Sequence, residues 1–217
     1  MGDHIETIKA AVINGAHKEI ESLVQKALDA GVNPEKIIDE AMIIGMDVVG
    51  NKFSQNLIFV PEMLVAAFAM KKGLDLIKPL LKSDDAEPRG TIVMCTVEGD
   101  VHDIGKNLVI MMLEGAGFNV VDLGVNQSVE TLVAKVKEIK PDILGLSALL
   151  TTTMPEMRKV IESLEVSGLR KDIKVMVGGA PVDSAFAGKI GADGYGKDAG
   201  EAVQIARNLI HDLVVAS

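Results

Sequence analysis

Apolar residues recur at helical spacing along the first part of the chain, up to about residue 82. Ile5, Ile8 and Val12 mark a first short helix. A second apolar stripe covers residues 20–28, and Gly31 behind it is a typical helix stop. The pattern therefore predicts two helices before residue 32.

A helix-start signal follows at Asn33-Pro34-Glu35, which combines an N-cap residue, a proline in the first turn and an early acid. Pro61 begins a further predicted helix that extends to about Leu81. Short connections between the four helices predict a small bundle.

Beyond a polar segment at 82–90, which we interpret as a linker, short apolar runs alternate with helical patterns. The runs predicted as strands are 91–97, 118–122, 142–147, 173–177 and 192–195. The helices are predicted at 103–116, 128–139, 155–166, 182–190 and 198–213. This alternation is typical of a parallel sheet covered on both faces, and five such units resemble the flavodoxin-like strand order 2-1-3-4-5.

The two patterns together predict an α + α/β protein of two domains. Residues 1–86 form a four-helix bundle, and residues 90–217 form a Rossmann-type, five-stranded parallel sheet with its helices.

Composition narrows the function classes. Hydrophobic residues make up 48% of the chain but aromatic residues only 3%, so the core is expected to be aliphatic and rich in methionine. A net charge of −9 makes a nucleic-acid partner unfavourable. The single cysteine, Cys95, excludes an intrachain disulfide and lies in an apolar strand, where we expect a core thiol in a reducing compartment.

The sequence carries no recognisable export or membrane signal. Residues 1–4 are not a basic region followed by an apolar one, and the apolar stretch at 57–70 is interrupted by Pro61 and Glu62. We therefore expect a cytoplasmic protein without a membrane partner.

Candidate chemistry lies in the segment 99–105, directly after the first predicted strand. Asp100 and His102 stand two residues apart in this strand-to-helix loop, where α/β proteins bind their ligands. In the predicted strand order, the first and third strands are neighbours, so the loop that holds His102 meets the segment after Ser147. A carboxylate that holds one imidazole nitrogen leaves the other nitrogen for a metal.

Other interpretations stay open at this point. A lone loop histidine is often satisfied by a neighbouring carboxylate, and the other histidines do not have ligand spacing with His102. A metal at His102 would therefore arrive with most of its ligands already supplied.

A phosphate loop at 99–105 is disfavoured because its aspartates repel phosphate. One of the three threonines at 151–153 is expected to cap the next helix. The segment 53–62 is either a hydrophobic staple or an apolar lid.

Three short motifs stand at a defined spacing: Asp100-x-His102-x-x-Gly105, then after 41 residues Ser147-x-Leu149, then after 28 residues Gly178-Gly179. This arrangement resembles the cobalamin-binding signature of corrinoid-dependent methyltransferases. The first half of the chain resembles the helical cap domain that precedes the corrinoid domain in this family, through the motifs Gly45-Met46, Val49-Gly50, Phe53 and Val60-Pro61-Glu62. The chain as a whole is similar to the small corrinoid proteins of methanol, methylamine and methoxy-compound methyltransferase systems.

The resemblance implies a role for each motif. His102 would be the lower axial ligand of cobalt in place of the cofactor's own base (base-off/His-on), and Asp100 would hold its other nitrogen. Thr153 stands where a hydroxyl completes this relay, a departure if serine is the norm. The implied corrinoid-binding set is Glu98, Gly99, Asp100, Val101, His102, Asp103, Ile104, Gly105, Ser147, Leu149, Thr151, Thr152, Thr153, Gly178, Gly179, Ala180, Tyr195, Gly196, Phe59 and Met63.

The implied function is that of a methyl carrier without catalytic activity of its own. It would accept a methyl group on cobalt from a substrate-specific methyltransferase and deliver it to a second methyltransferase that serves a thiol or tetrahydrofolate, with a reductive activator as third partner. The alternatives are the cobalamin-binding subunit of a mutase, a cobalamin-sensing regulator, or a flavodoxin-like signalling domain. A regulator would need a basic DNA-binding module, which this acidic chain lacks.

Overall fold

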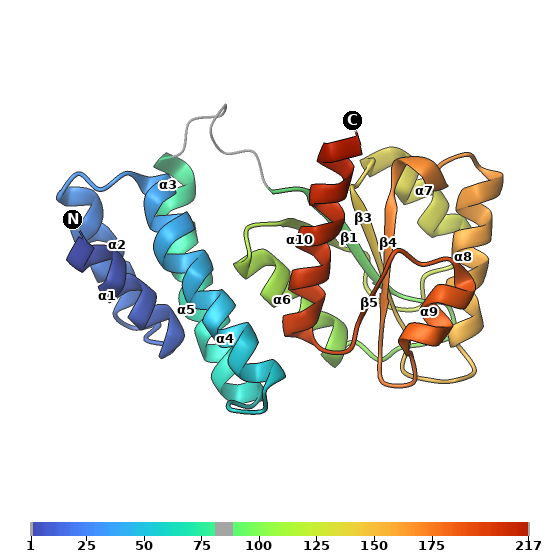
Figure 1. Cartoon of the computed structure of the whole chain (residues 1–217), viewed down its shortest axis with the longest axis horizontal. Coiled ribbons are helices and arrows are strands. Elements are labelled where there is room, and N and C mark those ends of the chain that lie inside the picture. The colour runs from blue at the N-terminus through green and yellow to red at the C-terminus, as the bar shows by residue number, and fades with distance from the viewer. Residues whose placement is uncertain (1, 81–88, 217) are drawn as a thin grey trace. The chain divides into compact units, whose positions relative to one another are not determined.

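The computed structural model describes residues 2–80 and 89–216, which divide into a helical unit and an α/β unit. Most of the expected linker, residues 82–88, and the expected end of the fourth helix at Leu81 lie outside the described residues. Figure 1 shows the element order along the chain. Among the residues that the structure describes, no helix combines the length and the apolarity needed to cross a membrane.

The helical unit is built from four helical segments, as the sequence pattern predicts. Its elements are α1 (Gly2–Ile13), α2 (Ile20–Asp29), the consecutive α3 (Pro34–Lys36), η1 (Ile37–Ile43) and α4 (Ile44–Ser54), then α5 (Val60–Ile77) with a final turn η2 (Lys78–Leu80). The N-cap prediction is confirmed at Asn33, whose side chain accepts a hydrogen bond from the backbone N–H of Glu35.

The third helical segment of this unit, made of α3, η1 and α4, contains a π-helical stretch, η1, that the periodicity does not predict. Next to it the methionine core is closely packed: Met42 and Met46 are buried, and a Cβ placed on Gly73 of α5 would lie 2.0 Å from Met42 Cε. A side chain at position 73 would therefore require the flexible end of Met42 to move.

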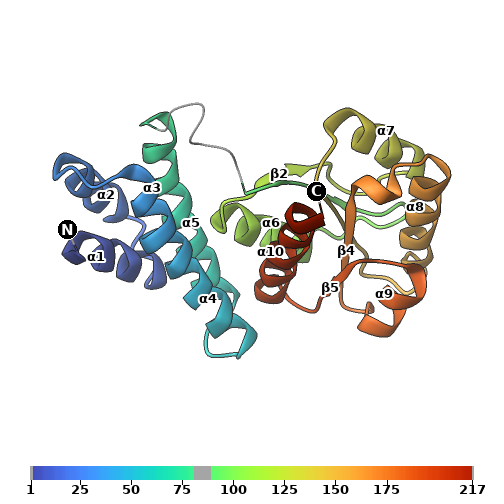
Figure 2. The same cartoon turned by 45° about the horizontal axis from the view of Figure 1, so that its top comes forward.

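The α/β unit contains a five-stranded parallel sheet in the order β2-β1-β3-β4-β5, and the predicted flavodoxin-like topology is confirmed. Its strands are β1 (Thr91–Thr96), β2 (Asn119–Asp122), β3 (Ile143–Ser147), β4 (Lys174–Gly178) and β5 (Gly194–Gly196). Its helices are α6 (Ile104–Gly115), α7 (Val129–Ile139), α8 (Met154–Val166), the turn η3 (Arg170–Asp172), α9 (Ser184–Ile190) and α10 (Ala199–Ala216). Figures 1 and 2 show α6 and α10 on one face of the sheet and α7, α8 and α9 on the other.

The register of the sheet aligns the ends of four strands. Thr96 pairs with Ser147, Ser147 with Gly178, and Gly178 with Gly196. The core beneath this row is aliphatic, as the composition predicts, and Cys95 is buried within it. Burial on both faces of the sheet explains why the strands appear as near-continuous apolar runs in the sequence. The loops that follow these four residues therefore emerge along one edge.

Candidate functional site

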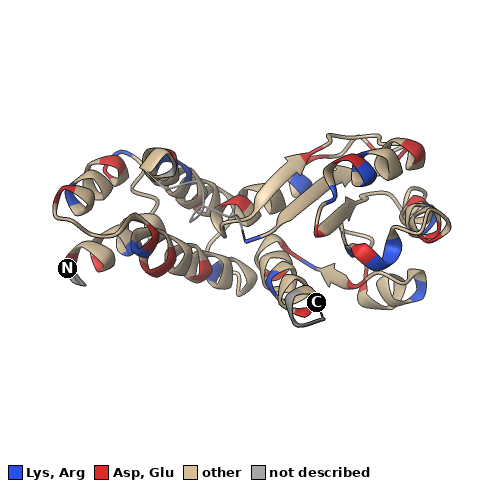
Figure 3. Cartoon of the chain, turned by 90° about the horizontal axis from the view of Figure 1, so that it is seen from above, with Lys and Arg blue, Asp and Glu red and all other residues tan. Residues whose placement is uncertain are grey.

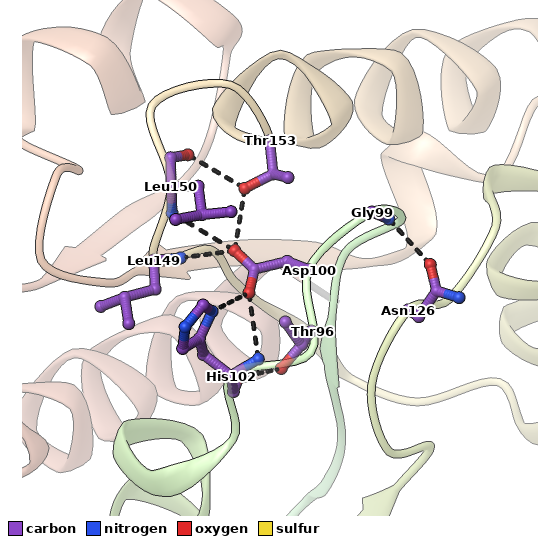
Figure 4. Close-up of polar contacts among 8 residues, drawn as sticks. All are labelled: Thr96, Gly99, Asp100, His102, Asn126, Leu149, Leu150 and Thr153. Atoms are coloured by element: carbon purple, nitrogen blue, oxygen red, sulfur yellow. Dashed lines mark hydrogen bonds and ion pairs between the residues drawn. The ribbon is translucent and has the colours of Figure 1, made fainter.

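The loop between β1 and α6, residues 97–103, lies at the carboxyl edge of the sheet beside the start of the β3–α8 loop (Figure 4). Thr96 is buried at the end of β1, and its hydroxyl donates a hydrogen bond of 3.0 Å to the carbonyl oxygen of His102. The loop thus folds back onto the strand from which it emerges. Residues 101–105 are nevertheless all exposed.

Asp100 is the centre of the site. Its side chain is fully buried. Oδ1 accepts hydrogen bonds from the backbone N–H of His102 at 3.0 Å and from the imidazole Nδ1 of the same residue at 2.7 Å. Oδ2 accepts from the backbone N–H groups of Leu149 at 2.8 Å and Leu150 at 3.3 Å, and from the hydroxyl of Thr153 at 2.8 Å. One carboxylate therefore joins the loops after β1 and β3 (Figure 4).

These hydrogen bonds keep Asp100 ionised. Burial is the largest single effect and by itself would raise the pKa of the carboxyl. The hydrogen bonds from Leu149, from the backbone and ring of His102 and from Thr153 together outweigh burial and hold the Asp100 pKa well below its usual range. Asp100 is therefore a carboxylate at neutral pH, and both of its oxygens act only as acceptors.

The ionised carboxylate fixes the tautomer of His102. Because Oδ1 can only accept, Nδ1 of the imidazole must carry the proton that joins them. In the neutral ring, Nε2 then has a free lone pair. Nε2 has no hydrogen-bond partner among the described residues, and 48% of the His102 side chain is exposed. The site thus presents one oriented imidazole nitrogen.

Thr153 does not cap α8 in the way the sequence predicts. It occupies the N-cap position, but its side chain makes no capping hydrogen bond, so the expectation that one of the threonines at 151–153 caps this helix is wrong. Its hydroxyl lies instead 2.8 Å from Asp100 Oδ2 and 2.9 Å from the carbonyl oxygen of Leu150. The hydroxyl donates to a buried, ionised carboxylate, and a charge-assisted hydrogen bond of this kind is strong enough to set the direction of the side chain.

The remaining predicted residues of the α/β unit are distributed along the same edge. Ser147, Gly178 and Gly196 lie in the row of strand ends, and Tyr195 lies in β5 beside it. A Cβ on Gly179, whose φ is +127°, would lie 1.9 Å from the carbonyl oxygen of Ala148, so this glycine is required by a backbone contact. The exposed members are Glu98, Gly99, Val101, Asp103, Ile104, Gly105, Leu149, Thr151, Thr152 and Ala180.

Phe59 and Met63 lie in the helical unit. Met63 is 1% exposed, whereas Phe59 is 66% exposed at the start of α5. The backbone N–H of Phe59 donates to the carboxylate of Glu62, half of a capping box.

Comparison with known protein families gives two matches. Residues 90–204 match a B12 binding domain, and residues 4–78 match a second B12 binding domain model. The chain belongs to the B12-binding corrinoid proteins.

Relatives of this corrinoid protein cover nearly its whole length. Dimethylamine corrinoid protein 1 of Methanosarcina acetivorans is 44% identical over 95% of the chain and 97% of its own length. Among solved structures, a cobalamin-binding protein from Desulfitobacterium hafniense DCB-2 is 35% identical, with a TM-score of 0.83 over 94% of this chain and 98% of that one. The methanol:cobalamin methyltransferase complex of Methanosarcina barkeri contains a chain 35% identical, with a TM-score of 0.84 over 96% of this chain and 80% of that one.

The residues of this corrinoid protein fit the cofactor of its family. Among the described residues, no group of three His, Cys, Asp or Glu side chains gathers to hold a metal ion. A metal bound at His102 must therefore bring its other ligands with it, as a corrinoid does. Val101 and Ile104, on either side of the imidazole in the chain, are 68% and 78% exposed, which suits contact with a large ligand.

Sequence reasoning did not identify four residues of the candidate site: Thr96, Lys106, Asp122 and Asn126. Lys106 lies in the first turn of α6, is 3% exposed, and pairs with Asp122 at 2.6 Å. A lysine in the first turn of a helix is disfavoured by the helix dipole, and this is the only sequence signal that could have singled it out. Asn126 is exposed and carries no such signal. Basic and acidic residues are otherwise interleaved along the helices (Figure 3).

Proposed function

We propose that this corrinoid protein is a methyl carrier, which receives a methyl group from a substrate-specific methyltransferase and yields it to a second methyltransferase. Bound corrinoid supplies the cobalt atom on which the methyl group is carried. The observation that supports this most directly is the oriented imidazole of His102, whose unpartnered Nε2 faces away from the carboxylate that holds Nδ1. The 44% identity to a dimethylamine corrinoid protein supports the same role.

Within this proposal, His102 binds the metal through Nε2 in place of the cofactor's own base. Asp100 holds the proton on Nδ1 and so keeps the Nε2 lone pair available. Thr153 donates to the other oxygen of Asp100 and keeps that carboxylate from rotating. Whether or not His102 binds a metal, the proton on Nδ1 would remain within hydrogen-bonding distance of Asp100, so the pair could adapt to a change of charge at the metal.

The displaced base and nucleotide tail of the cofactor need room elsewhere along the same edge. Ser147 and Thr151 are proposed to line their slot, with Gly178 and Gly179 at the end of β4 beside it. Tyr195 and Gly196 in β5 are proposed to lie near the end of the tail. The register of the sheet supports this placement, because the strand ends on either side of Ser147 carry no large side chain.

We propose that the helical unit shields the methyl-bearing face of the cofactor. Phe59 is the strongest candidate because its ring is exposed at the start of α5. Met63, one turn further along, supports that helix from its buried side. Other partners that the proposal requires are an acceptor methyltransferase for a thiol or tetrahydrofolate and a reductive activator.

The metal-ligand role is tested on the chain loaded with cobalamin under reducing conditions. In the cobalt(II) state, electron paramagnetic resonance should show nitrogen splittings that are triplets in the unlabelled protein and doublets in protein labelled with ¹⁵N-histidine. His102→Ala should abolish this change, whereas His211→Ala, at an exposed histidine of α10, should retain it. A chain that stays colourless, or one whose splittings do not change on labelling, contradicts the proposal.

The carrier role is tested with purified partners. The loaded chain is mixed in turn with methanol-specific and with mono-, di- and trimethylamine-specific methyltransferases, and then with thiol- and tetrahydrofolate-directed enzymes. We expect methyl transfer with one donor enzyme and one acceptor enzyme. Loading without transfer in any combination would favour the regulator alternative.

A further inference from the structure

An ion pair between the buried Lys106 and Asp122, whose side chain is 39% exposed, holds the start of α6 directly after the His102 loop. The side chain of Lys106 is 1% exposed, and its ammonium group lies 2.6 Å from Asp122 Oδ1 and 3.0 Å from Asn107 Oδ1. Burial and the helix dipole both disfavour a cation in this position. Asp122 Oδ1 also accepts the backbone N–H of Gly124 at 2.8 Å. The first turn of α6 is thus attached to the end of β2.

The segment that follows β2 also holds the beginning of the His102 loop. Asn126 adopts a left-handed backbone conformation with a φ of +53°. Its side-chain oxygen accepts the backbone N–H of Gly99 at 2.8 Å (Figure 4), and its own backbone N–H donates to the carbonyl oxygen of Asp100 at 2.9 Å. Two consecutive residues of the loop are therefore held from one side.

We propose that residues 122–126, which we name the β2 clamp, orient the imidazole of His102 by holding its loop at both ends. Asn126 holds the loop at Gly99 and Asp100, and Asp122 holds it through Lys106. Asn126, Asp122 and Lys106 are positioning residues, because they act on the imidazole through the backbone and through Asp100. The importance of this orientation for methyl transfer rests on the proposed function, whereas the orientation itself is a property of the chain without cofactor.

The loop needs such a support because its own contacts are few on the exposed side. Residues 101–105 are exposed, and the Asp100 hydrogen bonds hold only the face that points toward β3. The β2 clamp provides the contacts on the opposite side of the loop, which faces β2. With both sides held, the backbone of the loop keeps Nδ1 of His102 within hydrogen-bonding distance of Asp100.

The test measures the tautomer of His102 in the cofactor-free chain at alkaline pH, where imidazoles are neutral. Long-range ¹⁵N–¹H NMR distinguishes a proton on Nδ1 from one on Nε2, and His102→Gln assigns the signal. The wild-type ring should carry its proton on Nδ1. Asn126→Gly keeps the left-handed backbone but loses the acceptor, so it should shift the ring to a mixture of tautomers and speed exchange of the Gly99 amide at least tenfold.

Matched variants separate positioning from general stability. Asn126→Asp keeps both the acceptor and the tolerance for a left-handed backbone, so it should retain the wild-type tautomer. Lys106→Met removes the ion pair with similar volume, and should again give a mixed tautomer. Asn119→Gly, at the opposite end of β2, controls for loss of stability and should leave the His102 tautomer unchanged.

Two outcomes would contradict the proposed role of the β2 clamp. The first is that Asn126→Gly and Lys106→Met lower the unfolding temperature while the His102 tautomer and the Gly99 exchange rate stay as in the wild type. The second is that Asn119→Gly produces the same change of tautomer. Because no corrinoid is present, failure of the chain to bind cobalamin contradicts the proposed function and leaves this result intact.

Discussion

At the scale of single residues, a buried carboxylate is stable only when donors meet its lone pairs. Asp100 accepts hydrogen bonds from five donors, four of which are supplied by backbone or side-chain groups outside the imidazole. Three of the five donors are backbone N–H groups, so the side chains of His102 and Thr153 are the partners of Asp100 that can rotate.

Thr153 allows one of these hydrogen bonds to be tested. Thr153→Val removes the hydroxyl that donates to buried Asp100 but keeps the shape of the side chain. Because a hydrogen bond to a charged group contributes about 1.5–3 kcal/mol, the free energy of unfolding should fall by about 2 kcal/mol in urea titrations. Thr153→Ser keeps the hydroxyl and should lose less than about 1 kcal/mol, the value of a buried methyl group. Equal losses in the two variants would show that the hydroxyl contributes nothing.

The raised pKa of the Cys95 thiol predicts how the free energy of unfolding changes at alkaline pH. Burial raises the pKa of its thiol from an ordinary value of 9.0 to about 12, with nearby Lys106 opposing this shift. A group whose pKa is raised in the folded state stabilises the fold fully below its unfolded pKa, and this stabilisation is lost as the pH rises from about 9 through 12.

Urea titrations between pH 8.5 and 11 should therefore show a steeper fall in the free energy of unfolding for the wild type than for Cys95→Ala. The native thiol should also resist alkylation at pH 8 until the chain unfolds. Parallel curves for the two proteins, or rapid alkylation of the native chain, would contradict this account.

At the scale of elements, the contact between the ends of β3 and β4 depends on Gly179. Replacement by alanine combines a φ of +127° with a Cβ 1.9 Å from the Ala148 oxygen. The backbone conformation alone should lower the free energy of unfolding by about 1–3 kcal/mol, and the clash should lower it further. Gly188→Ala in α9 has open space around its Cβ and should stabilise the chain by about 0.5–1 kcal/mol. Similar effects of the two substitutions in thermal or urea unfolding would contradict the assigned contact.

The elements themselves could be predicted from the sequence because their periodicity is strong. Alternating apolar runs and helical stripes indicated every strand of the sheet and its order. The π-helical stretch at 37–43 could not be predicted, because a single extra residue in a turn hardly changes an apolar stripe. The hydroxyl of Thr153 could be assigned to the Asp100 relay only through the family resemblance, since residue types alone do not distinguish a helix cap from a partner for Asp100.

At the scale of the whole molecule, the sequence reveals the motif residues but not the residues that hold them in place. The pair Asp100 and His102 could be found because the two residues are close in sequence and lie at a strand end. Lys106, Asp122 and Asn126 act on that pair across the fold, and their contacts join positions 16 and 27 residues apart. Such pairings depend on how β1 and β2 align, which residue types alone do not specify.

The long-range hydrogen bonds of the Asp100 carboxylate constrain when the candidate site can form. Its contacts with Leu149, Leu150 and Thr153 span 49, 50 and 53 residues of chain. A nascent polypeptide must therefore leave the ribosome at least as far as the start of α8 before this binding arrangement can close. The hydrogen bonds around Asp100 can therefore form together only in a chain whose β1 and β3 have already paired.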